Sequence, residues 1–426
     1  MKHEHESLPG EEAPHLAATP ALSDRDICDS YLYLLGRLLA LRHEHFDFLG
    51  GARWNEIVHR DLDNTTNHAH LEVARSDAWI AVDESSCTLI DVPKITGRYY
   101  TAQVINPWGE TVVNINDRTF PGHPYGPFAL CLKGARCLVP GGARRIDLPC
   151  RKARVIVRIE IGANPKDAVA LQRRFTIRAT GAPAIASAVA MPLFPDERLP
   201  GVEVFDTALA VLASEMDVNL GMEAIQAKVR AIAALARNRG ARGRIDRVVR
   251  DRAWGLKPVL YMTEHDWVTS RLAGSFGPDW LSRTASNLFE MWSNYKTEAT
   301  VFRTGTVGRL DGSSTYTMTF SKNDLPWARV RYFWSLACHD ARTRRVVPNA
   351  LRRYVLTSHA NTQLDSDGAL RLYFAPNLPD GAPEQNWVPT PAGQPYILTW
   401  TSYGPDGATI SGQWYPPPIH RVDGTL

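Results

Sequence analysis

The sequence predicts a mainly β protein with two jelly-roll-like β-sandwich domains joined by a helical segment. Over residues 69–182, short segments rich in β-branched and aromatic residues alternate with Gly, Pro, Asn and Asp, which is typical of a sandwich. Over 183–297 apolar residues recur with helical spacing, and over 298–426 the strand pattern returns. Because strands and helices are segregated along the chain, an α/β nucleotide-binding fold is not expected.

The chain begins with a tail over residues 1–22 that is polar, acidic and contains proline, and we expect it to be disordered. A helical lead-in follows over 23–68. Ser23 can cap a helix that has acids in its first turn, and apolar residues with helical spacing start at Ile27. We therefore expect an amphipathic helix that ends near Gly50.

Two further helical stretches are expected in the middle of the chain. Residues 205–240 are largely helical, with Gly240 as a suitable C-terminal stop, and residues 278–294 carry an aromatic stripe that is most simply core packing. In the last module, Asp-Gly pairs at Asp311 and Asp367 favour tight hairpins between strands.

Composition limits the classes of partner. The 426 residues allow two or three domains, and 48 Lys and Arg against 45 Asp and Glu give a net charge of +3, which does not indicate nucleic acid as a main partner. Three stretches are locally basic (133–158, 228–257 and 329–353) and fit either a solvated surface or an anionic ligand. No long apolar run and no signal sequence is visible, which predicts a soluble protein without a membrane span. We expect it in the cytoplasm, or in the periplasm if a leader has been removed.

Cysteine usage indicates a reducing compartment. The six cysteines include no C-x-x-C spacing, and they are most simply free and partly buried thiols. A disulfide between Cys131 and Cys137, or between Cys137 and Cys150, remains open.

The C-terminal module carries an ordered set of motifs. They are Phe333-Trp334-Ser335, Pro348-Asn349, Arg353-Tyr354, Asp367-Gly368, Asn386-Trp387-Val388-Pro389, Tyr403-Gly404-Pro405 and the tail from Trp414 to Pro418. In this order they resemble the module known as domain of unknown function 1214.

The N-terminal module resembles the usual partner of that module, domain of unknown function 1254. The segments that match are "DAWIAVD", "TLIDVP", "GRYYTAQVINPWGE" and "ARVIVRIEI". Ahead of Trp79 the family commonly shows an Asn-Asp-Thr-x-Tyr-like segment, whereas this chain reads "TTNHAHLEVARSDAW". The resemblance implies paired jelly-roll-like domains, a helical connector and a homo-oligomer, and it implies no particular activity.

One candidate metal site is visible. His68 and His70 lie two residues apart, so on a strand both imidazoles point to one face, and Glu72 shares that face if the strand continues. The three residues could hold a divalent metal ion. The alternative is a pair of surface histidines.

The "EQNWVPTPAGQPYIL" segment places Trp387 on a loop that prolines stiffen. The ring either closes the end of the sandwich or forms the wall of a ligand site for a sugar or another flat molecule. The candidate ligand-binding residues are Trp108, Trp334, Tyr354, Asn386, Trp387 and Trp414. The candidate catalytic residues are Asp117, Arg118, Asp340, Arg353 and Glu384, because charged residues on stiff loops of a β scaffold often carry the chemistry.

Two functions fit these patterns. The first is a hydrolase or lyase that acts on a carbohydrate or another oxygen-rich small molecule at a site between the two β modules. The alternative is a non-catalytic oligomeric protein that binds a ligand or has a structural role.

Overall fold

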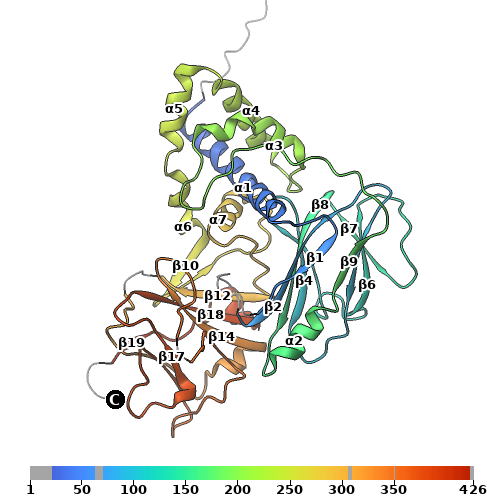
Figure 1. Ribbon diagram of the computed structural model, residues 1–426. Coiled ribbons are helices and arrows are strands. Elements are labelled where there is room, and N and C mark those ends of the chain that lie inside the picture. The colour runs from blue at the N-terminus through green and yellow to red at the C-terminus, as the bar shows by residue number, and fades with distance from the viewer. Residues whose placement is uncertain (1–21, 63–70, 306–308, 350, 423–426) are drawn as a thin grey trace, which may run out of the picture.

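The computed structural model describes residues 22–62, 71–305, 309–349 and 351–422. Figure 1 shows a helical region and two β regions that meet around helices α1 and α7. The protein is mainly β, as predicted, and the strands of the described residues belong to four sheets. Within the described residues, no helix combines the length and the apolar character that a membrane crossing requires.

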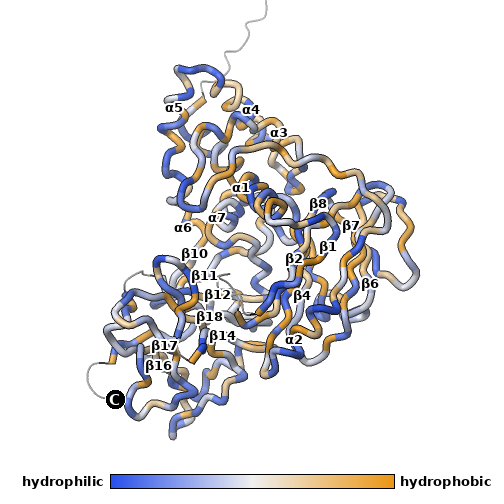
Figure 2. Tube along the Cα trace, viewed as in Figure 1, coloured by the Kyte–Doolittle hydropathy of each residue, from blue (hydrophilic) through white to orange (hydrophobic). Residues whose placement is uncertain are grey.

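The N-terminal β region is a sandwich of two sheets. The first has the order β1 (Glu56–His59), β2 (Val73–Ala81), β8 (Lys152–Glu160), β4 (Tyr100–Ile105), β5 (Thr111–Ile115). The second has the order β7 (Arg144–Leu148), β6 (Gly126–Leu132), β3 (Thr88–Val92), β9 (Thr176–Ala179). Helix α2 (Pro165–Gln172) adjoins β2 and β8. Apolar side chains from both sheets form one core, which accounts for the largely apolar strands in Figure 2.

Strand β8 is buried on both faces, and its two faces differ in chemistry. Ala153, Val155 and Val157 point into the sandwich core. The alternate residues are charged apart from Ile156, and they face α1 and the C-terminal module instead. Two of them form ion pairs with α1: Lys152 with Glu44 at 3.2 Å and Arg154 with Asp47 at 2.5 Å.

The C-terminal β region also has two sheets. The larger has the order β10 (Tyr261–Glu264), β11 (Trp267–Ser270), β12 (Ala299–Thr304), β18 (Tyr396–Pro405), β14 (Val330–Asp340), β15 (Val355–Thr357). The smaller has the order β17 (Trp387–Pro389), β16 (Leu370–Ala375), β13 (Tyr316–Phe320), β19 (His420–Arg421). Helix α8 (Gly407–Ser411) follows β18, and the core between the sheets includes a stacked pair of tryptophans, Trp334 and Trp400.

The helices form a separate core around α1. They are α1 (Asp24–Leu49), α3 (Ala208–Ser214), α4 (Glu223–Leu235), α5 (Arg239–Val249), α6 (Lys257–Leu260) and α7 (Trp280–Phe289). A capping box between Ser23 and Asp26 starts α1 at the predicted position, and Gly50 ends it. Figure 2 shows α5 as largely hydrophilic at the outer edge of this group.

Two expectations about local structure need correction. Helix α1 is not amphipathic over its middle. Every residue from Ser30 to Arg42 is buried against neighbouring helices and the first sheet, including Arg37. The predicted helical connector also contains β10 and β11, which form a hairpin through His265 (φ 51°) and extend the larger sheet by pairing with β12. Strand pairing with a partner distant in sequence decided this local structure.

Candidate functional site

A cavity of about 860 Å³ lies on the outer face of the larger C-terminal sheet. Strands β12, β14 and β18 contribute its floor, and residues of α6 and α7 contribute its wall. The N-terminal module adds Glu72 to the lining. The elements around the cavity meet near the centre of Figure 1.

A second cavity, of about 270 Å³, lies between the two β modules. It is lined by Arg75, Tyr99 and Arg158 of the first sandwich, by the segment 289–296 after α7, and by Tyr403 and its neighbours in the second sandwich. Both cavities share Phe289 and Arg303 in their linings. We call the two cavities together the inter-module cleft.

Strand alternation explains which side chains reach the cleft. Along β14 and β18, Trp334 and Trp400 point into the sandwich core. The neighbouring positions point the other way, so His339 and Thr399 line the larger cavity. The hydroxyl of Thr399 lies 3.3 Å from Nδ1 of His339. The same sheet therefore supplies a hydrophobic core on one face and a polar floor on the other.

Arg158 is the most unusual charge in the cleft. It is only 8% exposed, and among the described residues no acid forms an ion pair with it. Its Nη1 donates a hydrogen bond of 2.6 Å to Gln103 Oε1. It lies directly opposite Arg75 in the β2–β8 register, while Arg75 is paired with Asp77 at 2.9 Å. Burial, followed by repulsion from Arg75, lowers the pKa of Arg158.

Further positive charge lines the same region. Arg303 pairs with Glu290 at 2.5 Å, and Glu290 also accepts a hydrogen bond from Ser270. Lys296 is half-buried, and burial lowers the pKa of its ammonium group. The lining of the smaller cavity contains Arg158, Arg303 and Lys296 but only one acid, Glu290. The cavity therefore carries a local excess of positive charge.

A buried tyrosine and carboxylate join the two modules at the cleft. The Tyr403 hydroxyl donates a hydrogen bond of 2.7 Å to Glu72 Oε1. Burial and the Glu72 carboxylate raise the pKa of Tyr403 well above its usual value, so the phenol remains protonated. Its ring stacks on Phe333 with centroids 4.3 Å apart, which fixes the position of the hydroxyl.

The predicted metal ligands are only partly described. Glu72 lies in the cleft wall and accepts the Tyr403 hydrogen bond. His68 and His70 lie outside the described residues, so the three-residue metal site remains a prediction. The one group of three or more potential metal ligands within the described ranges is formed by cysteines, on the N-terminal sandwich.

Arg118 lies at the junction of the two modules, as expected for a site between them, but it lines neither cavity. Its guanidinium binds both oxygens of Glu298, at 2.6 and 3.2 Å, and donates to the Tyr332 hydroxyl at 2.8 Å. It also pairs with Asp117 at 2.9 Å. Because its donors are engaged by protein groups, the geometry is that of a clasp between the modules.

The residues around the "EQNWVPTPAGQPYIL" loop hold one another in place. The indole N–H of Trp387 donates to the Ala375 carbonyl at 2.8 Å, and the ring is 9% exposed. Arg353 pairs with Glu384 at 3.1 Å and donates to the Trp387 carbonyl at 3.3 Å. Asn386 is fully buried, and its side chain bonds backbone atoms of Gln363 and Arg371. This environment is that of a ring closing the sandwich, and none of these residues lines the cleft.

The remaining candidates lie apart from one another. Trp108 is fully buried under Arg283 in the helical region, and Trp334 stacks on Trp400 in the C-terminal core. Trp414 is buried and donates its indole N–H to Asp324 at 3.0 Å. Large aromatic side chains are favoured in cores, and these three residues pack in cores instead of forming the predicted wall of a ligand site.

The last two candidates also lie outside the cleft cavities. Asp340 ends β14 and accepts backbone hydrogen bonds from Arg342 at 3.0 Å and Thr343 at 2.6 Å. The bond from Thr343 is the main cause that lowers the pKa of Asp340, which is the behaviour of a turn residue. Tyr354 is partly exposed next to Arg353 and lines neither cavity.

Apart from Glu72, the sequence reasoning missed the residues that line the cleft. Arg158 lies in "ARVIVRIEI", where charged and apolar residues alternate, a pattern that normally places the charges in solvent. Tyr403 belongs to a family motif, but Glu72, which it contacts, lies 331 residues away in the sequence, so no local pattern indicates the contact. One signal could have found Arg158: charged residues alternate with apolar ones in a strand that lies in the middle of its sheet, where both faces are covered.

Two family models match the chain. The one described as Protein of unknown function (DUF1254) matches residues 54–179, and the one described as Protein of unknown function (DUF1214) matches residues 298–407. The chain belongs to the family with paired DUF1254 and DUF1214 domains. In this protein the cleft therefore lies between the two domains that define the family, and the helical region separates them along the sequence.

Comparison with known proteins adds information about the fold. The crystal structure of the VPA0106 protein from Vibrio parahaemolyticus aligns with 94% of this chain and 100% of its own, at 19% identity and a TM-score of 0.64. An uncharacterized protein from Burkholderia cenocepacia aligns with 91% of this chain and 86% of its own, at 10% identity and a TM-score of 0.43. No curated protein matches the chain. The Vibrio structure shows that the whole architecture is shared.

Proposed function

We propose that this DUF1254–DUF1214 protein is a hydrolase or lyase for an anionic carbohydrate or a similar oxygen-rich small molecule, with its site in the inter-module cleft. The observation that carries the proposal is the buried Arg158, which has no acidic partner among the described residues and lines a cavity between the modules. Arg303 and Lys296 line the same cavity.

Electrostatics favours an anionic ligand there. Burying a charge without a counter-ion costs several kcal/mol, so natural proteins retain such a group when a ligand neutralises it. A guanidinium binds a carboxylate or sulfate group through two parallel hydrogen bonds. The cavity of about 270 Å³ between the modules shares Arg303 and Phe289 with the neighbouring cavity of about 860 Å³, and these volumes are of the size that holds a small-molecule ligand.

The neighbouring groups can serve proton transfer. Arg158 and the Tyr403–Glu72 pair interact electrostatically. In a lyase, a cation on the substrate carboxylate stabilises the charge that develops when the adjacent C–H proton leaves. The Glu72 carboxylate accepts the C–H proton, and the Tyr403 hydroxyl, which then no longer donates to Glu72, gives its proton to the departing oxygen. These roles depend on residues that both modules contribute, so the site is complete only when the modules are docked.

A non-catalytic binding protein is the second candidate. It is favoured by the pairing of the acids in the cleft wall: Glu290 binds Arg303, and Glu72 binds Tyr403. The five predicted catalytic residues also do not gather at one cavity. A binding role would need only the positively charged side chains of the smaller cavity and no catalytic acid or base.

The test combines binding with turnover. Thermal shift and calorimetry with uronate-containing and neutral oligosaccharides should show binding of the anionic ligands only, and chromatography with absorbance at the wavelength of unsaturated uronates should show product. Arg158→Gln should weaken binding at least tenfold. Arg178→Gln, on an exposed position of β9, is the matched control and should change nothing. Binding without product would favour the second candidate, and equal affinity for neutral and anionic ligands would contradict both.

A further inference from the structure

Three cysteines converge on the N-terminal sandwich, on the face of the second sheet that points away from the sandwich core. Cys87 and Cys131 lie opposite each other at the ends of β3 and β6, with Cα atoms 4.5 Å apart. Cys137 comes from the loop between β6 and β7, and its Cα atom is 6.7 Å from that of Cys87. All three sulfur atoms lie within 4.8 Å of one another.

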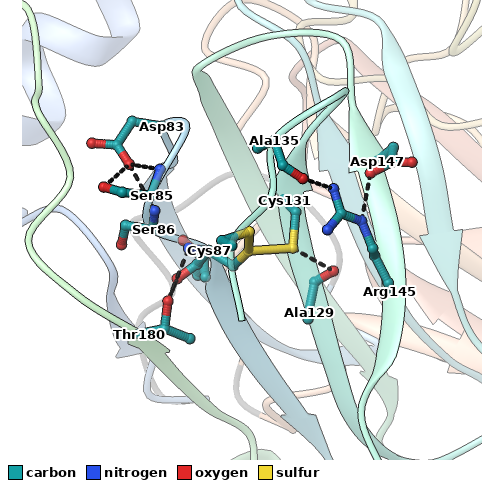
Figure 3. The surroundings of a disulfide bond; sticks show 12 residues. Asp83, Ser85, Ser86, Cys87, Ala129, Cys131, Ala135, Arg145, Asp147 and Thr180 are labelled. Carbon is teal, nitrogen blue, oxygen red and sulfur yellow. Dashed lines mark hydrogen bonds and ion pairs between the residues drawn. A yellow bond between two sulfur atoms is a disulfide. The ribbon is translucent and has the colours of Figure 1, made fainter. Parts of the chain in front are cut away.

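The geometry allows two disulfides that exclude each other. The Cys87 sulfur lies within bonding distance of both Cys131 and Cys137, and both Cα separations fall in the range that disulfides span. One sulfur atom forms a single disulfide, so the third cysteine always remains a thiol. Figure 3 shows the disulfide that joins Cys87 to Cys131. The expectation of free thiols was therefore wrong at these positions, because the fold brings together strands that are 44 residues apart in sequence.

The three cysteines differ in access. Cys87 and Cys131 are fully buried, whereas Cys137 is partly exposed and precedes Leu138, which is 91% exposed. Arg145 holds the loop that carries Cys137, since its Nη2 donates to the Ala135 carbonyl at 2.7 Å (Figure 3). A reagent from solvent therefore meets Cys137 first.

The loop is also basic. Exposed Lys133 and Arg136 precede Cys137, and Arg144 and Arg145 follow at the start of β7. No acid occurs in the sequence between Lys133 and Arg145. Positive charge around a reactive group raises the local concentration of anionic reagents.

We propose that Cys137 is the entry point of a three-cysteine thiol–disulfide relay that transfers a disulfide from a small anionic disulfide, of the glutathione class, to the buried pair Cys87 and Cys131. Thiolate exchange of this kind proceeds through mixed disulfides. The other cysteines do not compete, because burial raises the pKa of the Cys150 and Cys338 thiols, and Cys28 lies in the helical region.

The exchange balances in three steps. The Cys137 thiolate attacks the small disulfide and releases the first small thiolate, which leaves a mixed disulfide on Cys137. The Cys87 thiolate then attacks the Cys137 sulfur and releases the second small thiolate. The Cys131 thiolate finally attacks the Cys87 sulfur, and the electron pair of the broken bond returns to Cys137. Two protein thiols are oxidised to one disulfide, the small disulfide is reduced to two thiols, and the protons of Cys87 and Cys131 end on those thiols.

The experiment follows the pairing of each cysteine over time. The full-length chain is reduced, desalted and mixed with oxidised glutathione, and samples are alkylated at intervals and mapped by peptide mass spectrometry. The wild-type chain should end with the Cys87–Cys131 disulfide and an alkylated Cys137. Cys137→Ser should form that disulfide at least tenfold more slowly. Cys131→Ser should stop at the Cys87–Cys137 disulfide, and Cys87→Ala should retain glutathione on Cys137.

Control variants and metal analysis decide the remaining outcomes. Cys28→Ser should oxidise at the wild-type rate. Formation of the Cys87–Cys131 disulfide in Cys137→Ser at the wild-type rate would overturn the relay. So would stoichiometric binding of Zn²⁺ or Cu⁺ by the reduced chain that prevents glutathionylation of Cys137, because the cluster would then be a metal site. If Cys87→Ala does not fold, Cys131→Ser alone decides, through the presence or absence of the Cys87–Cys137 disulfide.

Discussion

Replacing Arg158 by methionine should stabilise the protein while abolishing its affinity for anions. Methionine keeps an unbranched apolar stem of similar length and removes the charge. Arg158 is 8% exposed and lies opposite another arginine, and its charge has no ion-pair partner among the described residues. A buried charge without a counter-ion costs several kcal/mol even after local relaxation.

The magnitude follows from two opposing contributions. Removing the charge relieves a desolvation penalty of about 3–5 kcal/mol in Arg158→Met. The substitution also leaves the buried Gln103 Oε1 without its hydrogen bond from Arg158 Nη1, which costs about 1–3 kcal/mol. The net expectation is a gain of about 2 kcal/mol in the free energy of unfolding, equivalent to an increase of roughly 4–8 °C in Tm for a domain of this size.

Differential scanning calorimetry measures this change directly as a shift in Tm. Added glucuronate or sulfate should raise the Tm of the wild-type protein through binding to the folded state and should leave that of Arg158→Met unchanged. Arg178→Met is the control, because an exposed arginine on β9 should alter neither quantity. A Tm at least 5 °C below wild type for Arg158→Met would refute the reasoning, because Arg158 would then be a structural residue.

Three other predictions concern residues outside the cleft. Arg118→Met should lower the free energy of unfolding by about 3–5 kcal/mol in urea titrations, since it leaves the buried Glu298 carboxylate without its ion pair; an unchanged midpoint would show that the clasp is dispensable. Burial lowers the pKa of His43 from 6.5 to about 4, with repulsion from Arg154 as the next cause, so between these values the unfolded chain binds a proton that the folded chain does not. Stability should therefore fall by about 2–3 kcal/mol as the pH drops from 6.5 to 4, and His43→Asn should lack this loss in pH-dependent unfolding curves. Trp387→Phe should lose about 1–2 kcal/mol with the hydrogen bond to Ala375, and its anion affinity in calorimetry should equal that of wild type; weaker binding would return Trp387 to the ligand site.

Much of the architecture could be predicted because it is written in local patterns. Period-two apolar residues predicted both β regions, and helical spacing after a capping serine predicted α1 with its first and last residues. The hairpin of β10 and β11 was missed, since its short strands are stabilised by pairing with β12 rather than by their own sequence.

The candidate site was harder to predict, because no local sequence pattern shows whether a charged side chain is buried. Arg118 was predicted as a catalytic residue of a site between the modules, but its partner Glu298 lies 180 residues away and occupies its guanidinium. From the sequence, Trp387 could close the sandwich or form a ligand wall, and the hydrogen bond from its indole to the Ala375 carbonyl shows the first environment.

The sequence by itself determined the family and the overall β–α–β order, because periodicity and turn residues act over a few positions. Only the tertiary structure decided which charges are buried together and which cysteines meet. Arg158 and Tyr403 come together in one cavity, and Cys87 meets Cys131 and Cys137, through strand pairings and domain docking. Such contacts join residues far apart along the chain, and their energies depend on burial that no local pattern records.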